Sequence, residues 1–278
     1  LPRRTRPCAS PLQVEDPPII KAEGPEDARR LVREQVPQKP DFIKIWYVLA
    51  GAEGPEATYD LVAAAIDESH KNGLPVAVHA TQLETAKLAV QAGADILVHS
   101  VDDPVDDAFI RQLLESNVVY VPTLVVHGHY IDSFTLGNVF TGEDFRLADP
   151  FVLGTLMEGH HFPAGNPLER FEAYKTQLEE AAEQQDRTRA ENLKRLAGAG
   201  VVIATGTDAG NIGTLHASSY FKELAWMREA GMSNGEILKA STLNAAAALG
   251  RDARVGSIEE GKEADLLLLP QNPLEDLQ

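Results

Sequence analysis

Short, continuously apolar runs recur along this chain and are separated by longer amphipathic stretches. The runs predict five strands, at residues 41–48, 75–79, 95–99, 118–122 and 201–205. Their apolar residues are continuous and do not alternate with polar ones, a pattern typical of strands buried on both faces of a parallel sheet.

The stretches between these runs carry helical periodicity and predict helices at residues 55–73, 81–93, 103–117, 167–197 and 233–248. Thr81–Glu84 and Ser233–Glu236 have the form of capping boxes, and Asp103 is expected to cap the third helix. The alternation of strand and helix predicts right-handed crossovers and an α/β architecture, with an open doubly wound sheet as the alternative to a barrel.

Two segments break this alternation. Residues 123–170 are rich in Gly, His, Phe and Pro without a clean period, and we expect an excursion over one end of the sheet, as in a lid. Residues 255–258 and 264–269 flank a Glu-Glu-Gly-Lys turn and predict a β-hairpin of a small separate sheet.

Composition narrows the classes of partner. A chain of 278 residues with 44% apolar content can bury a sizeable core, and its net charge of −17 repels nucleic acids and anionic membranes. Cys8, as the single cysteine, excludes an intramolecular disulfide and a multi-cysteine zinc module. A single cysteine is compatible with a cytoplasmic protein, although the sequence leaves the cellular compartment open. We therefore expect a small-molecule partner.

Four polar residues lie within, at the end of or shortly after the predicted strands: Lys44, His79, His99 and Asp208. The carboxyl ends of parallel strands form the active sites of barrels and open α/β sheets. Two imidazoles and a carboxylate would hold a divalent metal that activates water, and a buried lysine forms either a Schiff base or a carbamate. Taken singly, each histidine is more often a hydrogen-bonded core residue than a ligand, and Asp208 is as well explained as a turn residue or helix cap. Lys44 is the hardest to explain structurally, because a lysine between two isoleucines must snorkel, pair or be chemically altered.

Taken in order, the segments around these residues resemble the amidohydrolase superfamily. The similar segments are DFIKI at 41–45, VHA at 78–80, VHS at 98–100, TGTDA at 205–209 and GKEADL at 261–266. The resemblance is to the imidazolonepropionase-like and Xaa-Pro dipeptidase-like branch, and it extends from about residue 15 to the end of the chain.

This resemblance implies a (β/α)8 TIM-like barrel and a set of roles. Lys44 matches the lysine of strand four, which is often carbamylated by carbon dioxide and bridges two metals. His79 and His99 match the ligands of the second metal. Asp208 matches the catalytic aspartate that binds the first metal and shuttles a proton. One or two divalent ions are implied, with zinc favoured by nitrogen and oxygen ligands.

The chain departs from the family pattern at the His-x-His pair of strand one, because no such pair precedes Lys44. His127-Gly128-His129 follows the run at 118–122 and is not that pair. We therefore expect an incomplete barrel over residues 1–250, with strands four to eight and part of strand three near residues 7–10. Residues 251–278 would be the C-terminal part of a β-sandwich. The missing segment is expected in the native molecule or from a partner chain.

The resulting prediction is a metal-dependent hydrolase that cleaves a C–N bond of an amide, dipeptide or cyclic amide, and that is active only if the missing N-terminal ligands are supplied. Candidate substrate-binding residues are His127, His129, Tyr130 and His216, whereas His160 and His161 are interpreted as lid or surface residues. Assembly into a homo-oligomer is compatible with the family. Two alternatives stay open: a barrel lyase or aldolase with Lys44 as Schiff-base nucleophile, and a truncated, non-catalytic barrel module.

Overall fold

A parallel sheet forms the centre of the protein. The computed structural model describes residues 19–48 and 54–277. Its four strands are paired in the order in which they occur, all parallel: β1 (Ile43–Trp46), β2 (Val76–His79), β3 (Ile96–Val98) and β4 (Val119–Val121). The predicted α/β fold with a parallel sheet is therefore confirmed.

The fifth predicted strand is reduced to a single parallel bridge between Tyr120 and Ile203. The amide of Tyr120 donates to the carbonyl of Val202 at 2.8 Å, and the amide of Ala204 donates to the carbonyl of Tyr120 at 3.0 Å. Residues 201–205 thus lie beside β4 as predicted, but they continue the ladder for only one step. Within the described residues β1 pairs with β2 alone, and no closed barrel is seen.

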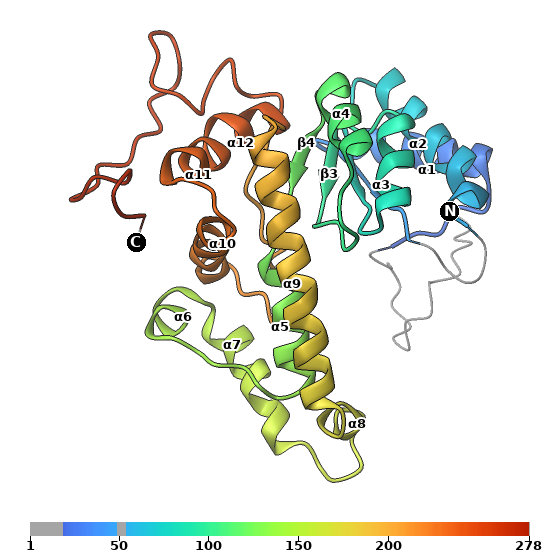
Figure 1. Cartoon of the computed structure of the whole chain (residues 1–278). Helices are drawn as coiled ribbons and strands as arrows, with labels where there is room; N and C mark the ends of the chain where they lie inside the picture. The colour runs from blue at the N-terminus through green and yellow to red at the C-terminus, as the bar shows by residue number, and fades with distance from the viewer. Residues whose placement is uncertain (1–18, 49–53, 278) are drawn as a thin grey trace.

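Helices cover the sheet and extend well beyond it (Figure 1). Those before β4 are α1 (Pro25–Gln35), η1 (Val36–Gln38), η2 (Pro55–Thr58), α2 (Tyr59–Lys71), α3 (Leu83–Gln91) and α4 (Asp107–Ser116). Those after it are α5 (Val125–Phe134), α6 (Gly142–Leu147), α7 (Pro150–Met157), η3 (Glu158–His161), α8 (Glu169–Glu172), α9 (Lys175–Gly198), α10 (Ser218–Glu229), α11 (Asn234–Ser241) and α12 (Leu243–Ala248).

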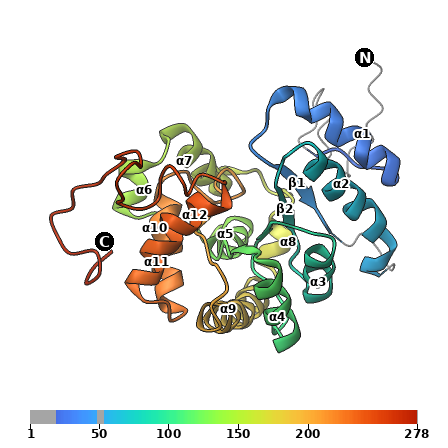
Figure 2. The same cartoon turned by 90° about the horizontal axis from the view of Figure 1, so that it is seen from above.

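The main core lies between the sheet and the helices that follow its strands. Ile66 of α2, Phe109 of α4 and Leu97 of β3 are all buried within it. Burying side chains of this size contributes about 1.5–3 kcal/mol each. Seen from above, α5 lies in the middle of the molecule, with α9 and α10 beside it (Figure 2). The helix after β4 is therefore held on several sides.

Of the three predicted helix N-caps, one is confirmed and two are wrong. Ser233 and Glu236 form the predicted reciprocal capping box at α11. Thr81 does not cap α3; the amide of Leu83 donates to Asp103 at 2.8 Å instead. α4 is capped by Asp106, which accepts from the amide of Phe109. The loop after β3 supplies the carboxylates for both helices, a tertiary arrangement that local patterns do not encode.

The excursion at 123–170 contains helices that its sequence did not predict. α5, α6, α7 and η3 lie in it, away from the sheet; α5 and α8 pack on the 24-residue α9, whereas α6 packs on α7 and α10 (Figure 1). Asp144 on α6 is fully buried, and Lys222 on α10 lies 3.1 Å from its carboxylate. Hydrogen bonds and ion pairs anchor this segment where hydrophobic periodicity is weak.

The predicted C-terminal hairpin is wrong for the structure described, because residues 255–258 and 264–269 form no strand there. The turn is present, with the amide of Glu263 donating to the carbonyl of Arg254 at 2.8 Å. Leu267 and Leu268 are almost fully exposed, so no sheet covers this apolar run. The division of the chain at residue 250 stays a prediction.

Candidate active site

The carboxyl ends of neighbouring strands bring the predicted chemistry together. Lys44 lies on β1, His79 ends β2 opposite Trp46 and Val98, and His99 directly follows β3. The rings of His79 and His99 have centroids 4.6 Å apart at an interplanar angle of 62°. The parallel register alone therefore places both imidazoles at one edge of the sheet.

Both imidazoles are held in the neutral form. Burial, followed by the charge of Lys44, lowers the pKa of His79 to about 4, whereas Asp208 acts in the opposite direction. Burial also lowers the pKa of His99 to about 2, helped by His79 and Lys44. At neutral pH each ring keeps an unprotonated nitrogen, the state needed for metal binding or for accepting a proton.

Lys44 and Asp208 act on each other across this edge. Partial burial lowers the pKa of Lys44, and the nearby Asp208 carboxylate opposes that shift. Asp208 itself is exposed, in the loop that follows the bridge at Ile203. Because Asp208 also affects the pKa of His79, and Lys44 and His79 affect that of His99, the four residues share one electrostatic environment.

Three non-glycine residues at the strand ends adopt left-handed backbone conformations. The φ angles are 76° at His99, 46° at Thr123 and 54° at Asp208. Such conformations cost of order 1–3 kcal/mol each and are concentrated at functional sites. Their position at three successive strand ends supports a functional interpretation of this edge.

Two partners of the site residues were not singled out from sequence. The Thr123 hydroxyl lies 2.8 Å from Nδ1 of His99 in a buried hydrogen bond, which leaves Nε2 of that ring for another partner. Asn211 donates from Nδ2 to Oδ2 of Asp208 at 2.8 Å. Thr123 directly follows a predicted strand, and Asn211 lies three residues beyond Asp208, so both could be noticed in the sequence. A small polar residue at either position, however, carries no specific signal.

The residues present suit a divalent metal in their chemistry. Nδ1 of His79 is buried without a hydrogen-bond partner among the described residues, which is costly for a polar atom unless a ligand satisfies it. Within residues 19–48 and 54–277, however, no three His, Cys, Asp or Glu side chains form a ready-made metal cluster. The two imidazoles are metal-ligand side chains by type, but the described residues do not form a complete metal site.

Residues 6–278 match the Amidohydrolase family. The chain belongs to that family. The sequence-based assignment to the amidohydrolase superfamily is thereby confirmed.

Two curated proteins show which members of the family this chain is similar to. It is 26% identical over 268 residues to ochratoxinase from Aspergillus niger, covering 94% of this chain and 47% of that protein. Over 83 residues it is 42% identical to imidazolonepropionase from Geobacillus kaustophilus (strain HTA426), covering 29% of this chain and 19% of that protein. The chain spans about half the length of the curated relative that it matches most extensively.

A solved structure shows the same fold. The crystal structure of a Xaa-Pro dipeptidase with methionine bound in its active site superposes with a TM-score of 0.67 and 26% identity, covering 92% of this chain and 55% of the other. Relatives of the two branches suggested by the sequence, imidazolonepropionase and Xaa-Pro dipeptidase, are therefore both found.

The predicted substrate residues divide between two environments. His127 on α5 helps to lower the pKa of His99, and burial, together with Arg189 and His79, lowers the pKa of His127 itself to about 3. Tyr130 hydrogen bonds to Asn211, and burial together with Asp208 raises its pKa. Each residue therefore interacts with at least one of the strand-end residues.

The other two candidates lie farther from the imidazole pair. Nδ1 of His129 lies 3.2 Å from the hydroxyl of Thr214, and burial and Lys222 lower the pKa of His129 to about 4. His216 is exposed beside Gly210, two residues beyond Asp208. His161, expected at the surface, is exposed at the end of η3.

Glu223 is a functional candidate that sequence reasoning missed. Its side chain on α10 is fully buried and accepts hydrogen bonds from the amides of Leu124 and Val125, each at 3.0 Å. These amides open α5, the helix that carries His127. Burial raises the pKa of Glu223 to about 7, opposed by the two backbone bonds. Its only sequence signal is an acidic residue on an otherwise unremarkable helix.

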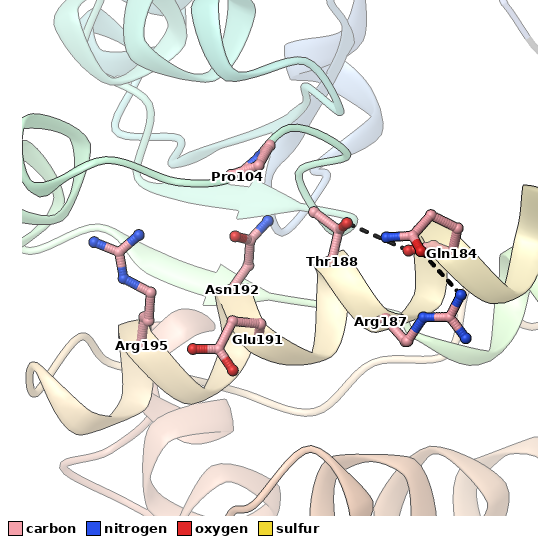
Figure 3. A pocket seen from close by; sticks show the side chains of 7 residues that line it. All are labelled: Pro104, Gln184, Arg187, Thr188, Glu191, Asn192 and Arg195. Atoms are coloured by element: carbon pink, nitrogen blue, oxygen red, sulfur yellow. Dashed lines mark hydrogen bonds between the residues drawn. The ribbon is translucent and has the colours of Figure 1, made fainter.

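Two cavities flank the long helices. One of about 240 Å³ lies on the outer surface of α9 beside Pro104, lined by polar side chains including Gln184, Thr188 and Asn192 (Figure 3). It is lined by none of the strand-end residues. A second of about 170 Å³ lies under the excursion, with Ile212 of the Asp208 loop in its wall. In the part of the chain that the structure describes, no helix is long and apolar enough to cross a membrane.

Proposed function

We propose that this amidohydrolase-family chain serves a metal-dependent hydrolase that cleaves a C–N bond of an amide, a dipeptide or a cyclic amide. The observation that carries the proposal is the pair of neutral imidazoles, His79 and His99, with ring centroids 4.6 Å apart at the edge where Lys44 and Asp208 interact. The family membership supports the same reaction class.

Divalent ions, with zinc favoured by the nitrogen and oxygen donors, would supply an activated water and polarise the substrate carbonyl. The unpartnered Nδ1 of His79 and Nε2 of His99 are the atoms suited to hold an ion. Lys44 is proposed to join them as a carbamate, since its lowered pKa favours the neutral amine that reacts with carbon dioxide.

Asp208 is proposed as the catalytic proton carrier. Its carboxylate would accept a proton from the attacking water and return it to the leaving nitrogen, which general acid–base catalysis requires of one group in two protonation states. The hydrogen bond from Asn211 fixes one oxygen of that carboxylate, so the other is left for the proton. His127 and Tyr130 are proposed to contact substrate, with His129 and His216 as weaker members of the same group.

We further propose that β1 to β4 correspond to strands four to seven of a (β/α)8 barrel, with residues 201–205 as strand eight. The four strands are paired in order and all parallel, the arrangement of adjacent barrel strands. Tyr120 continues this order to Ile203.

The test combines metal analysis with hydrolysis of a panel of amides, dipeptides and cyclic amides. With the missing first-strand ligands supplied, the protein should retain a divalent ion, and Asp208→Asn should lower kcat at least 10²-fold on whichever substrate the wild type cleaves. Asp252→Asn, at an exposed position distant in sequence from the site, is the matched control and should keep wild-type rates. Full activity of Asp208→Asn would overturn the role of this residue.

The lysine-dependent alternative predicts a different covalent fate for Lys44. A Schiff-base lysine incubated with a carbonyl substrate and borohydride gains the mass of the reduced adduct, whereas a carbamylated lysine does not. We expect no adduct at Lys44 by peptide mass spectrometry. Trapping at Lys44 would replace the hydrolase proposal by the lyase or aldolase one.

A further inference from the structure

An apolar cavity lies beside the Asp208 loop, and the proposed function does not yet use it. Its volume is about 170 Å³, and its apolar wall consists of Phe134, Leu136, Leu156, Phe162, Leu168 and Ile212. These side chains come from α5, α7 and the loops around them, so the excursion closes one side of the cavity and the Asp208 loop supplies another. We call it the α5–α7 cavity.

The Asp208 loop connects the cavity to the catalytic edge. Asn211 donates to Asp208 at 2.8 Å and accepts from the amide of Ile212 at 2.9 Å, and the Ile212 side chain lines the cavity. The loop also packs tightly on α5. A Cβ added at Gly213 would lie 2.7 Å from the carbonyl oxygen of His129, which backbone does not tolerate.

A row of aromatic rings follows the same path on α5. Tyr130, which hydrogen bonds to Asn211, stacks on Phe134 with centroids 6.1 Å apart. Phe134 lines the cavity and stacks on Phe171 at 5.0 Å. Tyr130 and Phe134 are one helical turn apart, a rise of about 5.4 Å. The Asp208 loop and this face of α5 therefore both connect the surroundings of Asp208 to the wall of the cavity.

The lining specifies what the cavity accepts. None of the side chains that the structure describes in its wall is charged; its polar members are the hydroxyls of Ser133 and Thr155 and the amide of Asn138. A dry cavity of about 150 Å³ lined by aliphatic and aromatic side chains is large enough for benzene. A charged group would find no ionic partner among these side chains.

We propose that the α5–α7 cavity binds one uncharged, ring-sized substituent of the substrate, such as a benzyl or branched aliphatic group. This specificity rests on the proposed amide hydrolysis and deepens it: preferred substrates are amides that carry an aromatic or large aliphatic group near the scissile bond. Burial of that group orients the carbonyl toward Asp208 and its neighbours.

The test separates binding from hydrolysis. Thr155 lines the cavity and is exposed, so Thr155→Phe fills the space without removing a core side chain. Thr188→Phe makes the same exchange in the cavity on α9 and is the matched control. The probes are N-benzylacetamide and N-methylacetamide, measured by ligand-observed NMR on the full chain, with thermal melting to confirm that each variant folds.

Wild type and Thr188→Phe should bind N-benzylacetamide at least tenfold more tightly than N-methylacetamide, and Thr155→Phe should lose that preference. A second variant, Phe162→Ala at a half-exposed position in the wall, should shift preference toward N-(1-naphthylmethyl)acetamide. Equal binding of the benzyl probe by Thr155→Phe and wild type would overturn the cavity assignment. If the probe binds as expected but no amide is cleaved, the hydrolase proposal fails and the binding site stands.

Discussion

Asn211 hydrogen bonds to the one carboxylate proposed to move protons, with 2.8 Å between its Nδ2 and Oδ2 of Asp208. Groups that orient a catalytic or metal-binding side chain typically contribute 10- to 100-fold to affinity or activity. We expect Asn211→Ala to lower kcat by that factor with little change in melting temperature. Steady-state kinetics on an amide cleaved by the wild type measure it.

The matched control for Asn211 is Asn166→Ala, because Asn166 also bonds to local backbone groups in a loop but lies in the excursion. Its kcat should equal that of the wild type. A wild-type kcat for Asn211→Ala would show that Asp208 needs no such partner.

Thr123 is expected to set the orientation of His99 through the hydroxyl that lies 2.8 Å from Nδ1. Thr123→Val has nearly the same shape but lacks the hydrogen bond, and should weaken zinc binding about 10- to 100-fold. Thr123→Ser retains the hydroxyl and should stay within a few-fold of wild type. Competition with a chromogenic chelator gives the affinities, and equal affinities for Val and Ser would contradict the assigned role.

Glu223 should make stability fall as pH rises. Its folded pKa of about 7 exceeds the ordinary value of 4.5, so the unfolded state loses the proton first and the folded state binds more protons between these values. The difference corresponds to roughly 3 kcal/mol of unfolding free energy lost across this window. Urea denaturation at pH 4.5, 6 and 8 should show this loss in the wild type.

Glu223→Gln removes the titration and should flatten that part of the pH profile. Glu229→Gln, on the exposed side of the same helix, serves as control and should keep the wild-type slope. An identical slope in Glu223→Gln would mean that folding does not shift the pKa of this carboxyl.

Asn192 on α9 should be a large contributor to stability. Its amide donates to the carbonyls of Val101 and Asp103 and accepts from the amide of Val105, each at 2.9 Å. Asn192→Leu leaves these backbone groups without their partner, at a cost of about 2–5 kcal/mol. Chemical denaturation should reveal this loss, whereas exposed Glu191→Gln should change unfolding free energy by less than about 0.5 kcal/mol.

Sequence reasoning succeeded where burial on both faces of a strand leaves a strong pattern. Four predicted strands are present within two residues of their expected ends, and the run at 201–205 takes its place beside β4. It failed where structure depends on contacts distant in sequence. The carboxylate that serves Leu83 comes from Asp103, and α6 is anchored by Lys222, so neither could be inferred from neighbouring residues.

The candidate site follows the same division. His79 and His99 were recognised because each closes an apolar run, and the parallel sheet then brings their rings together. Thr123 and Glu223 were missed because their importance lies in one partner each, a ring nitrogen and a helix N-terminus. Residues 7–10 and Cys8, which the sequence linked to a third strand and to no function respectively, lie outside the described residues.

The left-handed backbone at His99, Thr123 and Asp208 supports the candidate site but lowers the stability of the folded chain. Glycine would adopt each of these angles without steric penalty. A library of variants sorted only for thermal resistance should therefore enrich glycine at exposed Asp208, where no core packing is lost, and lose the site while improving the fold. Directed evolution of this chain needs a functional screen at every round, because stability by itself selects toward an inert scaffold.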